Sequence, residues 1–302
     1  MSNQKAIEIR GLVKNYGRVK ALKGVDLDVN CGEIFGFLGP NGAGKTTAIR
    51  CMLDLIRPQS GSISMLGINP QEEPEAVKEQ VGYLPGELHV DENMTARQVF
   101  RFFNRLRGNR SDWGFIEELS ERLKLELISP IKNFSKGNKQ KIGIVQALMH
   151  KPELLLLDEP TSSLDPLMQQ EVLRMLAEAQ DNGATVFFSS HIISEVQAVA
   201  DRVAIIREGK IVEVAVTADL LHRSMRQVRI RFQQPTEAEE LYQIPGVELI
   251  AKDDSMGILL QVEGQMDVLI KTLAKYPVND FETERTSLEE IFLAYYNGEE
   301  DK

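Results

Sequence analysis

The feature that most constrains this chain is the glycine-rich run GPNGAGKT at residues 39–46. The apolar segment EIFGFLG (33–39) comes before it, and TTAIRCMLDLI (46–56), with the apolar spacing of a helix, follows it. The run fits G-x-x-x-x-G-K-[ST], and a strand before it and a helix after it are the context that this motif needs. The sequence therefore predicts a phosphate-binding loop inside an α/β domain.

Each residue type in this loop has a physical reason. Gly39, Gly42 and Gly44 allow the backbone to curl so that its N–H groups point at phosphates. Lys45 would neutralise the β- and γ-phosphates of ATP, and Thr46 would ligate Mg²⁺ through its hydroxyl. A chance match has odds of roughly one in a hundred in a chain of this length. The expected ATP contacts are Gly39, Pro40, Asn41, Gly42, Ala43, Gly44, Lys45, Thr46 and Thr47.

An acidic pair follows the apolar run LLLLD (154–158), which has the character of a strand buried on both faces. Asp158 and Glu159 come at its end, where open α/β sheets bind ligands. We expect Asp158 to hold Mg²⁺ and Glu159 to polarise the attacking water, because phosphoryl transfer depends mostly on positioning and electrostatics. Taken alone, so short a motif has about even odds of being an ordinary polar end of a strand with no function. The phosphate loop upstream favours the functional interpretation.

Strands alternate with helices along the first two thirds of the chain, which predicts a parallel sheet in an α/β domain. The segments expected after the acidic pair are helix 166–181, strand 184–190, helix 192–199 and strand 202–208. Residues of about 90–150 are nearly all helical by pattern, and we expect them to form a helical subdomain. We place this first domain at residues 1–215.

The pattern changes after residue 215 and predicts a second, smaller α+β domain at residues 216–302. Its expected order is β-α-β-β-α-β, that of a ferredoxin-like unit. The segments are strand 228–232, helix 236–244, strand 247–251, strand 257–262, helix 265–276 and strand 278–284, with a last helix at 287–296.

Charge and hydropathy exclude several classes of protein. The chain has 302 residues and a net charge of 35 minus 45, or −10, so it lacks the basic face that a large nucleic-acid footprint needs. Its start shows no signal-peptide pattern, and no apolar window is long enough to span a bilayer. We therefore expect a cytoplasmic protein that binds no nucleic acid and reaches a membrane only through a partner.

With these motifs in place, the chain resembles the ATPase subunits of ABC transporters over about residues 6–215. Walker A is GPNGAGKTT (39–47), Walker B is LLLLDEP (154–160), and the signature aligns with FSKGN (134–138). The D-loop aligns with SSLD (162–165), the switch histidine with His191, and the aromatic residue that stacks on adenine with Tyr16 in KNYG. The resemblance implies a P-loop ABC ATPase that works as a nucleotide-sandwiching dimer.

The resemblance also assigns roles to these residues. Ser135, Gly137 and Asn138 would form an anion site at a helix N-terminus for the γ-phosphate bound by the other subunit. His191 would donate to the γ-phosphate, and Asp165 would cross the dimer interface. Tyr16 has about one chance in four of being an ordinary core tyrosine instead. The remaining histidines, His89, His150 and His222, match no element and are expected at the surface.

At two places the sequence departs from the family pattern, which affects the residue roles that the resemblance implies. The signature has Phe134, Lys136 and Asn138 where the family usually has Leu, Gly and Gln. After VGYLP (81–85), Gly86 stands where the family usually has the Q-loop glutamine. Glycine cannot ligate Mg²⁺, so the neighbouring Glu87 is a doubtful substitute.

The expected function is ATP hydrolysis by a subunit, paired with a copy or a homologue, that powers transport through a separate membrane permease. SKGNKQK, LPGE and SLEEIFLAYY resemble the ABC-2-type drug and antibiotic exporters, which implies export. Helix 95–107 carries Val99, Phe100, Phe102, Phe103 and Leu106, which we expect either in the core, at two chances in three, or in a groove for a permease helix. For the second domain two interpretations have about equal odds. It is either a regulatory or dimer-stabilising unit, or an addition that only stabilises the chain.

Two other classes of function stay open at this point. One is a soluble ABC ATPase that acts on ribosomes or nucleic acid, against which stand the single cassette, the absence of a long heptad run and the acidic balance. The other is a nucleotide-gated binding module without hydrolysis, which the presence of Glu159 and His191 argues against.

Overall fold

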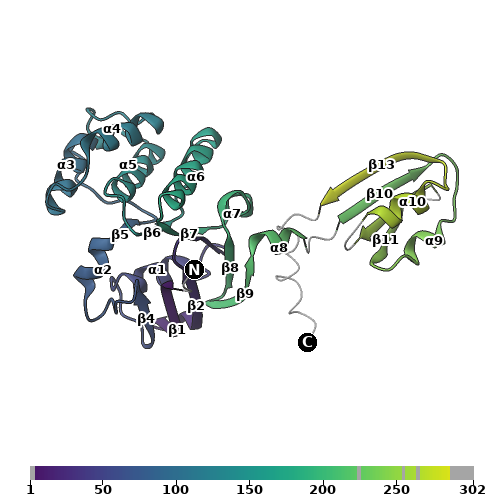
Figure 1. Ribbon diagram of the computed structural model, residues 1–302, viewed down its shortest axis with the longest axis horizontal. Helices are drawn as coiled ribbons and strands as arrows, with labels where there is room; N and C mark the ends of the chain where they lie inside the picture. Colours follow the sequence, from purple (N-terminus) through teal and green to yellow (C-terminus); the bar gives the residue numbers. More distant parts are fainter. Residues whose placement is uncertain (1–3, 223–225, 254–255, 263–265, 286–302) are drawn as a thin grey trace. The chain divides into compact units, whose positions relative to one another are not determined.

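The computed structural model describes residues 4–222, 226–253, 256–262 and 266–285. The chain divides into two compact units, residues 1–217 and residues 218–302 (Figure 1). Within the described ranges, none of the helices combines the length and the apolar character needed to cross a lipid bilayer.

The first unit is built on a six-stranded sheet with the strand order β5-β6-β7-β3-β8-β9. All neighbouring pairs are parallel except β8 and β9, which are antiparallel. The strands are β3 (Ile34–Leu38), β5 (Val81–Leu84), β6 (Leu154–Asp158), β7 (Thr185–Ser190), β8 (Arg202–Arg207) and β9 (Lys210–Val216). Every residue of β3, β6 and β7 is buried, which confirms the expected parallel core of an α/β domain.

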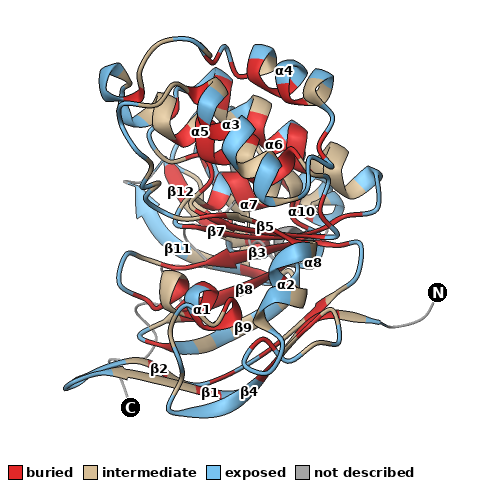
Figure 2. Ribbon diagram, turned by 90° about the vertical axis from the view of Figure 1, so that its left-hand side faces the viewer, coloured by how far each residue is buried: buried red, intermediate tan, exposed pale blue. Residues whose placement is uncertain are grey.

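Helices cover both faces of this sheet. Figure 2 shows α3, α5 and α6 on one side of the buried strands and α1 with a second sheet on the other. The helices are α1 (Lys45–Met52), α2 (Pro74–Gln80), α3 (Ala96–Leu106), α4 (Trp113–Arg122), the 3-10 turn η1 (Ile131–Asn133), α5 (Lys136–Leu148), α6 (Pro166–Asp181) and α7 (Ile193–Val199). The segment predicted as a helical subdomain thus contains α3, α4, η1 and α5.

The second sheet of this unit is antiparallel, with the order β2-β1-β4. Its strands are β1 (Lys5–Tyr16), β2 (Val19–Asn30) and β4 (Ser60–Met65). Apolar residues of β1, β2 and β4 pack with those of α1 and the central sheet into one core, which fixes α1 behind the phosphate loop. The sequence analysis missed β4, α2 and β9. The first two are short and polar, and their stability comes from neighbours rather than from local propensity.

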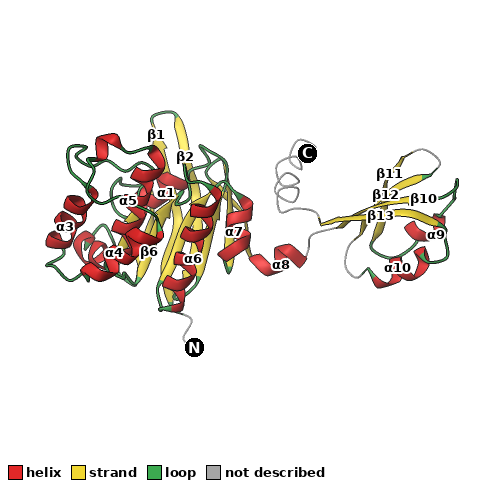
Figure 3. Cartoon of the chain, turned by 90° about the horizontal axis from the view of Figure 1, so that it is seen from above, coloured by secondary structure: helices red, strands yellow, loops and turns green. Residues whose placement is uncertain are grey.

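The second unit has a four-stranded antiparallel sheet with the order β11-β12-β10-β13. Figure 3 shows α9 and α10 together on one face of this sheet, where they close a separate apolar core. The elements are α8 (Thr217–His222), β10 (Arg226–Phe232), α9 (Glu239–Tyr242), β11 (Val247–Asp253), β12 (Gly257–Val262), α10 (Asp267–Leu273) and β13 (Val278–Arg285). The ferredoxin-like order is confirmed, although α9 is shorter than predicted. The helix predicted at 287–296 lies outside the described residues.

Candidate functional site

The phosphate loop connects β3 to α1, and its glycines are required by close approach. A Cβ on Gly39 would lie 2.4 Å from the carbonyl oxygen of Ile206. At Gly44, where φ is 113°, it would lie 2.7 Å from the carbonyl oxygen of Ala21. Gly42 has a φ of 84°, which favours glycine as well. The loop therefore holds a backbone path that side chains would block.

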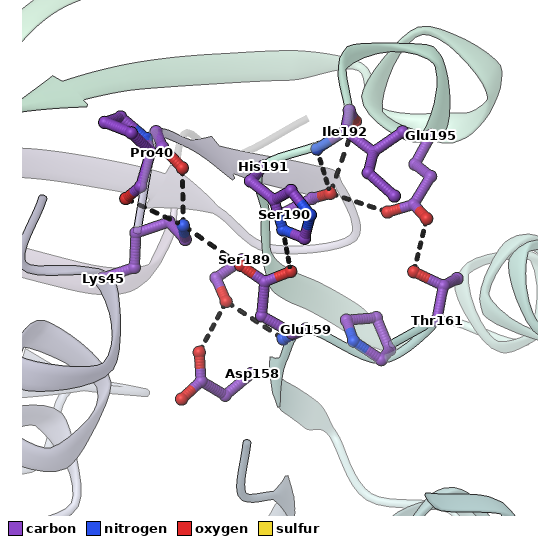
Figure 4. Close-up of polar contacts among 12 residues, drawn as sticks. Pro40, Lys45, Asp158, Glu159, Thr161, Ser189, Ser190, His191, Ile192 and Glu195 are labelled. Carbon is purple, nitrogen blue, oxygen red and sulfur yellow. Dashed lines mark hydrogen bonds and ion pairs between the residues drawn. The ribbon is translucent and has the colours of Figure 1, made fainter. Parts of the chain in front are cut away.

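Lys45, the first residue of α1, is only 5% exposed. Its Nζ donates to the carbonyl oxygens of Gly39 at 2.5 Å and Pro40 at 3.2 Å (Figure 4). The same Nζ forms an ion pair with Oε1 of Glu159 at 3.0 Å. Above the loop lies a cavity of about 450 Å³, lined by Val19, Lys20, Ala21, Lys23, Pro40, Asn41, Gly42, Gly44, Lys45, Thr46, Thr47, Glu159 and Glu208. Seven of the nine predicted residues of the phosphate loop, together with Glu159, thus border one space.

Glu159 follows β6 with a positive φ of 53°, so the chain turns sharply at this residue. Its backbone N–H donates to the carbonyl oxygen of Ser189 at 3.2 Å and to the Oγ of the same residue at 3.1 Å. Its Oε2 lies 2.7 Å from Nδ1 of His191 (Figure 4). The structure therefore brings the predicted base and the predicted switch histidine into direct contact.

Asp158 is fully buried at the end of β6. Its Oδ1 accepts a hydrogen bond from Oγ of Ser189 at 2.6 Å, whereas its Oδ2 has no hydrogen-bond partner among the described residues. Buried carboxylate oxygens are normally satisfied, and an oxygen without a protein donor is free to bind a cation or a water molecule. The residues present therefore fit a hard cation such as Mg²⁺.

A buried carboxylate that the sequence analysis missed supports both sides of this site. Glu195 on α7 is 5% exposed and accepts hydrogen bonds from Oγ1 of Thr161 at 2.5 Å and Oγ of Ser190 at 2.6 Å. Thr161 follows Glu159 by two residues, and Ser190 directly precedes His191 (Figure 4). Glu195 therefore fixes the two segments that carry Glu159 and His191. The available signal was a carboxylate one helical turn after His191.

The signature residues lie apart from the phosphate loop of the same chain. Oγ of Ser135 caps α5 by accepting from the backbone N–H of Asn138 at 3.2 Å. A Cβ on Gly137 would lie 2.5 Å from the carbonyl oxygen of Ser163, so α5 packs directly against the predicted D-loop. None of Ser135, Gly137 and Asn138 borders the cavity over the phosphate loop.

For three further predicted residues, the position in the structure does not test the predicted role. Tyr16 ends β1 with 46% of its surface exposed and pairs with Val19, which lines the cavity over the phosphate loop. Asp165 caps α6, and its Oδ1 accepts from the N–H groups of Leu167 and Met168, both at 3.1 Å. Glu87 is exposed in the segment after β5. The roles assigned to these residues stay predictions.

One expectation about the other histidines was wrong. His150, predicted at the surface, has both ring nitrogens buried. Burial, together with the positive charge of Arg107, lowers its pKa to about 4.

Comparison with known proteins defines the class. Residues 22–162 match the family described as ABC transporter, and residues 217–296 match the family described as the C-terminal domain of DrrA1-3-like ATP-binding proteins. A solved structure of the ATP-binding subunit of an ABC transporter is 30% identical, with a TM-score of 0.65 over 71% of this chain and 91% of that chain. The fold is that of an ABC-type ATPase.

Relatives extend the match to almost the full length. The bacitracin transport ATP-binding protein BcrA of Bacillus licheniformis is 34% identical over 91% of this chain and 95% of that protein. The daunorubicin/doxorubicin resistance ATP-binding protein DrrA of Streptomyces peucetius is 30% identical over 96% of this chain and 92% of that protein. The chain belongs to the ATP-binding subunits of ABC transporters, ATPases that power transport, and within them to the drug and antibiotic exporter subfamily.

Proposed function

We propose that this chain supplies the ATP-driven step of an antibiotic exporter and hydrolyses ATP at the site between Lys45, Glu159 and His191. The observation that carries the proposal is the position of the Glu159 carboxylate, 3.0 Å from Lys45 Nζ on one side and 2.7 Å from His191 Nδ1 on the other. Lys45 would bind the β- and γ-phosphates, Glu159 would orient the attacking water, and His191 would donate to the γ-phosphate.

Thr46 and Asp158 are the residues that would hold Mg²⁺. The bound ion would neutralise charge that develops on the phosphate oxygens. Among the described residues Oδ2 of Asp158 has no hydrogen-bond partner, which supports this role because a fully buried carboxylate oxygen is costly to leave unsatisfied. The adenine ring would stack on Tyr16, whose exposed ring lies at the end of β1 beside the cavity.

The active form in this proposal is a dimer, either of two copies or of one copy with a homologue. Ser135, Gly137 and Asn138 stand at the N-terminal end of α5 and do not border the cavity of their own chain. The N-terminus of this helix would instead bind the γ-phosphate held by the other subunit. Asp165 would act at the same interface, where its cap holds the start of α6 in place.

A groove beside β5 is the surface that we propose for the permease. It has a volume of about 480 Å³, and its walls include Leu53, Leu55, Pro85 and Phe103. The apolar residues of helix α3 lie in different surroundings: Val99 and Phe100 are core residues, Phe102 and Leu106 are exposed, and Phe103 lines the groove. Arg50 and Lys78 line this groove as well, so an apolar helix with an acidic residue would fit it.

The proposed location follows from this partner. The chain would sit on the cytoplasmic face of the cell membrane, held there by the permease. The names of the relatives, with bacitracin transport and daunorubicin/doxorubicin resistance, support export of an antibiotic. The same names favour transport over the alternative of a soluble ATPase that acts on ribosomes or nucleic acid.

The test is co-purification of the tagged chain from its native membranes in mild detergent, with ATP hydrolysis measured in parallel. We expect a polytopic membrane protein in stoichiometric amount. Leu55→Asp, at an exposed position in the groove, should reduce its recovery without changing the ATPase rate of the free subunit. Val212→Asp is the matched control, because Val212 is exposed on β9, at the opposite edge of the sheet from β5. Recovery of ribosomes or DNA in place of a membrane protein would overturn the proposal.

A further inference from the structure

Glu159 is held in an unusual backbone conformation by contacts from two sides. Its φ of 53° lies in the left-handed region, which is unfavourable for a residue with a side chain. On one side its N–H donates to the carbonyl oxygen and to Oγ of Ser189. On the other side its carbonyl oxygen accepts a hydrogen bond from Nε2 of Gln140 at 2.9 Å. Such a conformation persists only where its surroundings determine it, so these contacts set the direction of the Glu159 side chain.

Gln140 belongs to the interior of this region. The residue lies on α5, is 7% exposed, and donates from Nε2 to the carbonyl oxygen of Pro160 as well, at 3.2 Å. Because both partners are acceptors, the amide nitrogen of Gln140 must face the turn. The carbonyl oxygen of Glu159 also accepts from the N–H of Ser162 at 3.1 Å, inside the same turn. Among the described residues, Gln140 therefore supplies the donor that comes from outside this turn.

The direction of the Glu159 side chain decides which groups its carboxylate reaches. The two carboxylate oxygens lie 3.0 Å from Nζ of Lys45 and 2.7 Å from Nδ1 of His191. We propose that Gln140 is a positioning residue, which holds the turn at Glu159 so that the carboxylate lies between Lys45 and His191. This inference rests on the proposed role of Glu159 in hydrolysis. Gln140 acts through Glu159, since it is not among the described residues that line the cavity over the phosphate loop.

The donor comes from the helix that carries the predicted signature residues. Gln140 follows Ser135, the N-cap of α5, by five residues. Gly137 and Gln140 are three residues apart and so lie on one face of the helix. A Cβ on Gly137 would lie 2.5 Å from the carbonyl oxygen of Ser163, so this face contacts the segment after β6 at two places. The placement of Glu159 therefore depends on how α5 packs.

The test compares the rate of hydrolysis with the affinity for nucleotide in the full chain. Gln140→Met keeps the length of the side chain and removes the donor, so kcat should fall by about 10–100-fold, as expected when a reacting group is misplaced. A non-hydrolysable ATP analogue with Mg²⁺ should bind several-fold more tightly in calorimetric titration. The reason is that a carboxylate no longer held on Lys45 competes less with the phosphates for its charge. General damage to the fold would weaken binding instead.

Two further comparisons show whether the effect passes through Glu159. In the Glu159→Gln background, Gln140→Met should leave the affinity for the analogue unchanged, because the competing carboxylate is already absent. Gln146→Met is the matched control: it makes the same change six residues further along α5 and should leave the rate and the affinity unchanged. Gln140→Leu, a second substitution without a donor, should reproduce both effects of Gln140→Met.

The outcomes separate this inference from the proposed function. An unchanged rate in Gln140→Met and Gln140→Leu, or an affinity that does not rise, would overturn the positioning role. The same rise in affinity in the Glu159→Gln background, or the same effects in Gln146→Met, would overturn it as well. Normal turnover in Glu159→Gln alone would instead refute the proposed function on which the inference rests.

Discussion

Nζ of Lys45 lies 3.0 Å from Oε1 of Glu159, and the other oxygen of that carboxylate lies 2.7 Å from Nδ1 of His191. Lys45 is almost fully buried, so its charge is shared between Glu159 and the carbonyl oxygens of the phosphate loop. In the proposed function, a triphosphate that enters the loop would compete with Glu159 for this lysine. Binding of ATP would thereby release the carboxylate to orient water, which couples binding of the nucleotide to readiness for hydrolysis.

The first prediction concerns Glu159→Gln. Removing the carboxylate should lower turnover by about 10²–10⁴-fold, the usual contribution of a positioned acid–base group. It should also tighten ATP binding several-fold, because the carboxylate that lies 3.0 Å from Nζ no longer competes with the phosphates for the buried Lys45. Phosphate release and calorimetric titration measure the two effects. Normal turnover would refute the role of Glu159, and an unchanged ATP affinity would contradict the competition for Lys45.

A second prediction concerns His191→Ala. The variant loses the hydrogen bond to Glu159 and the donor to the γ-phosphate, so kcat should fall by about 10²-fold while the Kd for ATP changes little. Single-turnover and equilibrium binding measurements separate these quantities. Ser194→Ala, at an exposed position three residues on, is the control and should behave as the unmodified chain does. A loss of affinity that equals the loss of rate would show that His191 serves binding rather than hydrolysis.

The phosphate loop, the buried strand before Asp158 and the ferredoxin-like order could be predicted because each depends on a local pattern. Three glycines at fixed spacing, an apolar run and an alternation of strands and helices are all visible within short windows of sequence. The ion pair of Lys45 with Glu159 is different. It joins residues that follow β3 and β6, which are separated by β7 in the sheet. Local patterns do not fix strand order, so they could not predict this contact.

The contacts that hold the site residues in place could not be predicted from the sequence for the same reason. In the sequence, Glu195 is one more polar residue on an amphipathic helix, although its carboxylate joins the segment after β6 to the last residue of β7. The approach of Gly137 to Ser163 likewise depends on how α5 packs against the segment after β6. Sequence reasoning could name the members of the site, but tertiary packing decides which of them touch.

A third prediction tests the contact between α5 and the segment after Glu159. In Gly137→Ala the new methyl group would lie 2.5 Å from the carbonyl oxygen of Ser163, so the helix must shift. We expect a loss of about 1–3 kcal/mol in the free energy of unfolding and a strongly reduced ATPase rate, with ATP binding at the phosphate loop retained. Urea unfolding and nucleotide titration provide the measurements.

The control for that variant is Gly114→Ala on α4. A Cβ at Gly114 meets its nearest atom at 3.5 Å, an ordinary contact, and the position is helical. Alanine should therefore be neutral or stabilise by up to about 1 kcal/mol. If Gly137→Ala behaves as Gly114→Ala does, the close packing of α5 against Ser163 is not required for stability.

The last prediction concerns the pH dependence of stability. The pKa of His150 is lowered from 6.5 to about 4, first by burial and second by the charge of Arg107. Between these two pH values the imidazole is therefore mostly protonated in the unfolded chain and mostly neutral in the folded chain. The contribution of His150 should be constant above about pH 6.5 and should fall as the pH drops towards 4, by at most about 2 kcal/mol at pH 5. Replacing the imidazole in His150→Asn removes this component. Urea unfolding at pH 7.5 and pH 5 should therefore show a larger loss of stability in the unmodified chain than in the variant, and equal losses would mean that His150 is protonated in the folded protein.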